Sequence, residues 1–116
     1  MILITPDRVA AVWDMLRQFP PISKWKLPPA EEVEFTTSAR NDIHGQWSRW
    51  SNGTHIITVS VKRTGHLDTL IQTVAHEMIH AYQDQSGTST RAEHNAEFSR
   101  LASQVCRAFG FDEKAF

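Results

Sequence analysis

Residues 74–83, VAHEMIHAYQ, place two histidines four positions apart, with a glutamate directly after the first. On an α-helix, at about 100° per residue, His76 and His80 lie about 40° apart, close enough for both imidazoles to bind one ion. Glu77 lies about 100° from His76, too far round to bind that ion but able to accept a proton from an activated water. The spacing therefore predicts a zinc-binding helix with Glu77 as general base.

A catalytic zinc site needs a third protein ligand, and the segment HNAEFSRLASQVCRAFGF supplies two candidates. His94 lies at the N-terminal end of the apolar stripe predicted for this segment, so a helix pair joined by a loop would bring it to His76 and His80. Glu97 is the rival, about 60° away on the same helix. We favour His94 and expect Glu93 and Glu97 to be first-turn acids or hydrogen-bond acceptors for a ligand imidazole.

The remaining pattern predicts the elements that position these residues, in the order helix, three strands, helix, loop, helix. Thr5, Pro6 and Asp7 are typical of a helix start, and the Pro-Pro pair at 20–21 should end that helix near Phe19. Asn-Gly at 52–53 predicts a hairpin, and the simplest arrangement of the strands is an antiparallel meander. The expected ranges are 6–19 and 67–85 for the first two helices, 92–109 for the last, and the segments EVEFTT, IHGQWSRW and THIITVSV for the strands.

Composition indicates one α+β domain spanning residues 1–116 and excludes several classes of protein. The net charge of -1 gives no broad basic field for non-specific nucleic-acid binding. The single cysteine, Cys106, excludes a disulfide framework and a four-cysteine zinc site. The N-terminus lacks a signal-peptide pattern and no stretch is apolar enough to span a membrane, so we expect a cytoplasmic protein.

The pentad HEMIH and the later HNAEF together resemble the SprT-like metallopeptidase family, in which a third histidine opens the next helix. The similarity extends upstream through GQWSRWSNGTHIITVSV and LDTLIQTVAHE, so it covers about residues 43–111. With one cysteine, the chain resembles a compact member that lacks the cysteine zinc ribbon of many relatives.

This resemblance implies a zinc-dependent metallopeptidase, with zinc on His76, His80 and His94 and with Glu77 as general base. It also implies a zincin-type fold, in which an edge strand, expected to be HIITVSV, lines the cleft and pairs with an extended protein or peptide substrate. Because many relatives act on DNA-associated proteins, the resemblance also implies that this protein associates with DNA. We expect that association to be weak and to depend on a partner.

Two questions stay open at the level of sequence. The donor that would stabilise the oxyanion is one of Tyr82, His66 and Arg91. The alternative function is a zinc-stabilised module that binds peptide or DNA-associated partners without proteolysis, and Glu77 favours catalysis because a purely structural site needs no carboxylate there.

Overall fold

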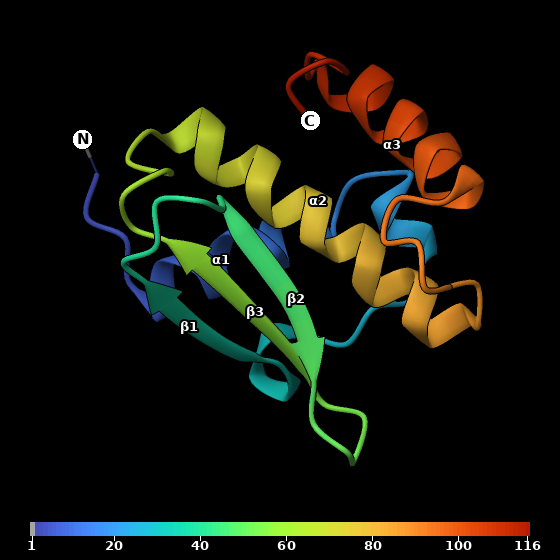
Figure 1. Ribbon diagram of the computed structural model, residues 1–116, viewed down its shortest axis with the longest axis horizontal. Coiled ribbons are helices and arrows are strands. Elements are labelled where there is room, and N and C mark those ends of the chain that lie inside the picture. Colours follow the sequence, from blue (N-terminus) through green and yellow to red (C-terminus); the bar gives the residue numbers. More distant parts are fainter. Residues whose placement is uncertain (1) are drawn as a thin grey trace.

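The computed structural model describes residues 2–116 as three α-helices and a three-stranded sheet, with two short 3-10 turns between the first helix and the sheet (Figure 1). Helix α1 spans Pro6–Leu16, and the Thr5 hydroxyl caps it by accepting a hydrogen bond from the Arg8 amide. The helix ends earlier than expected because the amides of Gln18 and Phe19 bond three residues back rather than four, which tightens the chain before the two prolines.

The sheet is mixed, so the expected antiparallel meander is wrong. Its strands are β1 (Glu34–Ser38), β2 (Gly45–Arg49) and β3 (His55–Ser60), in the spatial order β1-β3-β2. The expected β2–β3 hairpin is confirmed as an antiparallel pair, with Gly53 at φ +93° in its turn, whereas β1 pairs with β3 in parallel.

Burial explains why β3 takes the centre of the sheet. Its Ile57 and Val59 are fully buried, while β1 and β2 carry mostly polar, partly exposed side chains. The most apolar, β-branched strand is paired on both sides and the polar strands form the edges. The expectation that HIITVSV is the edge strand is therefore also wrong, because β2 is the edge next to the second helix.

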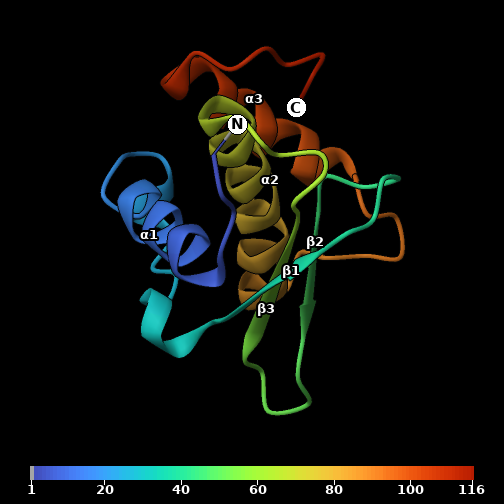
Figure 2. The ribbon, with the colours of Figure 1, turned by 90° about the vertical axis from the view of Figure 1, so that its left-hand side faces the viewer.

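Helix α2 spans Leu67–Ser86, close to the expected range, and Gly87 ends it in the left-handed conformation at φ +76°. It packs on β2 and β3, with α1 beside it on the same face of the sheet (Figure 2). Helix α3 spans Ala96–Phe109 and packs on α2. Its start at Ala96 corrects the expected start near Ala92, since the side chain of Asn95 caps the helix by accepting a hydrogen bond from the Phe98 amide.

A core of buried apolar side chains joins the three helices to the sheet, and Trp13, Leu16, Ile57, Val74 and Met78 are among its fully buried members. Trp13 also donates its indole N–H to the carbonyl of Pro28, which fastens α1 to the chain that leads into β1. Across residues 2–116, none of the helices has the length and hydropathy that a membrane span requires.

Candidate metal centre

Three imidazoles converge at one end of a cleft. His76 and His80 lie one turn apart on α2, and His94 lies in the turn just before α3 rather than on the helix. Their ligand atoms are all within 4.8 Å of one another, and Nε2 of His76 is 3.1 Å from Nε2 of His94. Nitrogens that share a tetrahedral zinc at about 2.0–2.1 Å are separated by roughly 3.3 Å, so the His76–His94 separation already suits a shared ion and modest side-chain rotation would bring the whole set to that spacing.

The donor chemistry also fits a metal. Burial, reinforced by the neighbouring His80 and His94, lowers the pKa of His76 to about 3, and burial together with His94 lowers that of His80 to about 4. Both imidazoles are therefore neutral at pH 7 and have a lone pair available to an ion. Three imidazole nitrogen donors suit zinc, which commonly takes three protein ligands and leaves a fourth position open.

Phe98 forms the floor beneath the histidines. This side chain from the first turn of α3 is 4 % exposed, and its ring stacks on His94 at 4.3 Å and on His80 at 4.8 Å between centroids. The sequence predicted Phe98 as part of the apolar stripe, but not its stacking on two predicted ligands. The ring of Phe116 also lies 5.3 Å from the ring of His76 between centroids.

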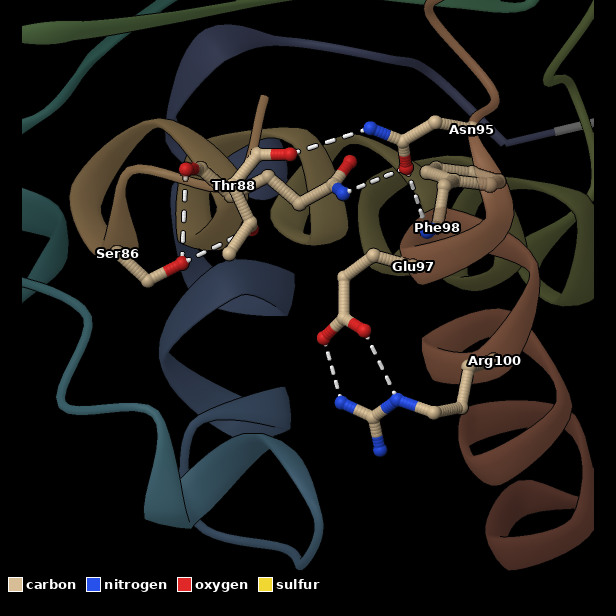
Figure 3. Close-up of polar contacts among 7 residues, drawn as sticks. Ser86, Thr88, Asn95, Glu97, Phe98 and Arg100 are labelled. Carbon is tan, nitrogen blue, oxygen red and sulfur yellow. Dashed lines mark hydrogen bonds and ion pairs between the residues drawn. The ribbon is translucent and has the colours of Figure 1, made fainter. Parts of the chain in front are cut away.

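A polar network fixes the turn that carries His94. Its neighbour Asn95 accepts hydrogen bonds from the buried side chain of Gln83 on α2 and from the Phe98 amide, each at 2.9 Å. The Asn95 amide nitrogen donates to the Thr88 carbonyl at 3.1 Å (Figure 3). It also donates to the Thr90 hydroxyl at 3.2 Å. These hydrogen bonds hold the turn that carries His94 against α2 and against the loop that follows α2.

Glu97, the rival candidate for third ligand, is engaged elsewhere. Its carboxylate forms a two-pronged ion pair with Arg100 one turn along α3, with Nε of Arg100 2.9 Å from Oε2 (Figure 3). It is a first-turn acid of α3, one of the two roles expected for it. The structure therefore places His94, and not Glu97, with His76 and His80.

Glu77 is a buried carboxyl beside the cluster, with only 5 % of its surface exposed. Burial, with a further contribution from Glu93, raises its pKa to about 8, and the nearby main chain of Trp47 partly offsets that rise. A carboxyl whose pKa lies close to neutral pH can both accept and release a proton under physiological conditions.

The cleft has a volume of about 720 Å³ and runs between β2 and α2. The cleft is lined by residues of β2 and of the segment just before it, by residues of α2, by the loop at 89–94 and by the segment 115–116. The predicted ligands and Glu77 all line this space. Arg40 and His44 line it too, although the sequence did not mark them as candidate site residues. Both lie between β1 and β2, and the sequence does not reveal the path of a segment that connects two strands that are not neighbours in the sheet.

The three candidates for an oxyanion donor lie outside the lining of the cleft. Tyr82 stacks on Trp25 at 4.8 Å, which places it against the core. His66 is at the N-cap position of α2, and Arg91 is exposed in the loop before His94. His55, the first residue of β3, is also away from the cleft lining: it is 5 % exposed and accepts a hydrogen bond from the Trp47 indole.

Comparison with known proteins gives the family. The sequence model of the SprT-like family matches residues 14–115, which include the last turn of α1, the whole sheet, both later helices and all residues of the cluster. The chain belongs to the SprT-like family. A search of curated proteins finds no match. Membership in the SprT-like family is consistent with a metalloprotease-type domain, and the histidine cluster could hold a metal ion.

Proposed function

We propose that this SprT-like protein is a zinc-dependent metallopeptidase. The observation that supports this most strongly is the convergence of His76, His80 and His94 at the end of a cleft that also contains a buried carboxyl, Glu77. Membership in the SprT-like family agrees with it. A site that served only to stabilise the fold would need a closed set of ligands and no proton acceptor beside it.

The three imidazoles would hold the ion in this proposal. Zinc bound by three nitrogens would lower the pKa of a water at its open position toward about 7 and would polarise the substrate carbonyl. The Phe98 ring keeps His80 and His94 in place, and the Asn95 network orients the turn of His94. These contacts organise the site before the ion arrives, which lowers the entropic cost of binding.

Glu77 would move the proton. Its carboxylate accepts a proton from the attacking water while the water oxygen bonds to the scissile carbonyl carbon. The same proton then passes to the leaving amine as the C–N bond breaks, so Glu77 ends the cycle ionised as it began. In the metal-free state burial keeps the pKa of this group high, and a nearby cation would favour its ionised form.

An extended peptide or protein segment is the proposed substrate. β2 is the edge strand that lines the cleft, and its unpaired side can add a further strand by main-chain hydrogen bonding. In this proposal the edge strand, the cleft and the histidine-bearing helix would together form a zincin-type layout, with β2 in the position that we expected β3 to take.

Replacing Glu77 by Gln tests this function. The variant keeps the shape of the side chain but not the basicity of the carboxylate, so we expect full zinc binding and loss of at least about a hundredfold in hydrolysis of an unfolded casein-like substrate. Wild-type protein reconstituted with zinc is the reference. Turnover retained in Glu77→Gln would refute the assignment of the base, and a wild-type protein that binds zinc and peptide without cutting would favour a binding module.

A further inference from the structure

Phe116 reaches the histidine cluster from a segment that follows the last helix. After α3, residues 111–116 turn back toward α2 (Figure 1). The Ala115 amide donates to the Asp112 carbonyl at 3.0 Å, which closes this turn. Ala115 and Phe116 thereby join the lining of the cleft, and the ring of Phe116 lies 5.3 Å from that of His76 between centroids.

Stacked aromatic rings hold Phe116 in this place. Its ring stacks on Phe111 at 5.8 Å between centroids, and Phe111 stacks on Phe109 of α3 at 5.5 Å. Phe116 is only half-buried, so some of its surface remains open, and it lines the cleft. An aromatic ring offers a ligand a large, rigid apolar surface, because only two side-chain angles need to be fixed. The cleft therefore has an aromatic surface beside a proposed metal ligand.

β2 and α2 run in the same direction along the cleft. At the start of β2, a Cβ on Gly45 would lie 2.7 Å from Cγ2 of Thr73. At the end of the strand, Arg49 pairs with Asp84 near the end of α2 at 3.5 Å. The residues just before β2 therefore lie beside the first half of α2, on the side of His76, and the loop that follows α2 lies on the other side.

The two sides of the cleft differ in chemistry. On the side of His76 the lining includes the apolar residues Ile43, Ala115 and Phe116, together with polar residues of α2. The half of the cleft beside His76 is therefore the half suited to an apolar side chain. On the other side the lining includes the polar residues Gln83, Ser89 and Thr90.

We propose that Phe116 is the specificity-determining residue of a subsite beside His76, which binds a bulky apolar side chain of the substrate. A peptide that adds to β2 would run past both the histidines and Phe116. An apolar side chain gains free energy when it leaves water and packs on the ring. A charged side chain would lose its hydration without finding a partner, because the Arg40 guanidinium on this side is already paired with Asp42 at 2.6 and 3.0 Å.

This inference rests on the proposed function, since it requires a peptide in the cleft. It predicts a preference for a bulky apolar residue on one side of the scissile bond and tolerance of polar residues on the other side.

NMR of the metal-free protein tests the contact between Phe116 and His76. We expect a nuclear Overhauser effect between the ring protons of the two residues, because their centroids are 5.3 Å apart. Phe116→Leu should shift the ring resonances of His76 and leave the fold intact, as reported by the amides of Ile57 and Val59 in the central strand. Absence of the effect in the wild type would overturn the inference, because Phe116 would then not border the proposed ion site.

Zinc-loaded Glu77→Gln protein tests the subsite without turnover. The probes are short alanine-serine peptides in which each position in turn carries leucine or asparagine, two side chains of similar size. We expect leucine to be preferred at one position by about tenfold or more in dissociation constant. Phe116→Ala in the same protein should remove most of this preference, and Phe116→Leu should keep most of it. The matched control is Leu3→Ala, which removes an exposed apolar side chain outside the cleft and should change nothing.

Two further measurements guard against an indirect effect. The zinc content of each variant shows whether Phe116 acts on peptide binding or only on the metal ligands. Binding of the preferred leucine peptide should also shift the ring resonances of Phe116 itself, and this measurement needs no substitution at that position. With wild-type protein, the cleavage sites in an unfolded casein-like substrate should show the same one-sided preference.

The outcomes separate this inference from the proposed function. Equal affinity for the leucine and asparagine peptides at every position, or an unchanged preference in Phe116→Ala, would overturn the subsite even if the wild type hydrolyses peptides. A preference that depends on Phe116 would support the subsite even if the wild type cuts no peptide, and the proposed catalysis alone would then fail. If none of the peptides binds, the subsite fails together with the proposed peptide substrate.

Discussion

Glu77→Gln should stabilise the metal-free protein, and the gain should grow with pH. The pKa of Glu77 is raised from 4.5 to about 8 in the folded state, so between these values the folded protein holds a proton that the unfolded chain releases. The folded state therefore loses stability as pH rises through this window, at about 1.4 kcal/mol per pH unit. Glutamine does not titrate and escapes this loss.

The expected advantage of Glu77→Gln from this cause is about 3 kcal/mol at pH 7 and under about 1 kcal/mol at pH 5. Urea unfolding of both metal-free proteins at the two pH values measures it. Other groups titrate in both proteins and cancel in the difference, and any packing change from the amide adds an offset that does not vary with pH. A stability difference that is the same at pH 5 and pH 7 would refute the reasoning from burial.

Bound zinc should weaken this pH-dependent stabilisation by Glu77→Gln. A divalent cation held beside Glu77 favours the ionised carboxylate and lowers its pKa. The pH-dependent advantage of Glu77→Gln should therefore shrink when the same unfolding experiment is run with zinc bound. An undiminished advantage would place the ion too far from Glu77 for the proposed proton transfer.

Three further predictions concern the cluster itself. His94→Ala should weaken zinc binding by more than about a hundredfold in a chelator competition, because loss of a ligand exceeds the usual effect of outer contacts, whereas Glu97→Ala should leave it unchanged. In the metal-free protein, burial lowers the pKa of His76 to about 3 and of His80 to about 4, so the unfolded chain binds more protons below about pH 6.5. In the Glu77→Gln protein, where Glu77 no longer acts in the opposite direction, the urea midpoint should fall as pH drops from 6.5 toward 4, and a flat profile would contradict this. Asn95→Ala removes the cap of α3 and should lower the free energy of unfolding by about 1 kcal/mol. It should also weaken zinc binding, because the turn that carries His94 loses its hydrogen bonds. Unchanged zinc affinity would show that this turn does not need Asn95.

The helix that carries the pentad could be predicted from sequence because its signals are local. Periodic apolar residues and Gly87 fix the limits of α2, and the four-residue spacing places His76 and His80 on one side of it. The structure brings His94 to the same place, as expected, although the metal-binding role of all three residues remains a prediction.

The errors arose where the outcome depends on distant parts of the chain. Strand pairing is non-local, and the Asn-Gly turn specified only the β2–β3 hairpin and not the partner of β1. The sequence did contain the information needed to identify the edge strand, because β2 is polar whereas β3 is apolar, and polar strands are typical of sheet edges. Asn95 was likewise a recognisable N-cap, and it would have placed His94 in the preceding turn.

The most direct test of the central claim is peptide hydrolysis by one protein sample before chelation, after chelation and after zinc is returned. The account predicts that activity is lost on chelation and recovers in proportion to zinc until one ion is bound per chain. Hydrolysis that is unaffected by chelation, or a protein that takes up no zinc at the three histidines, would contradict it.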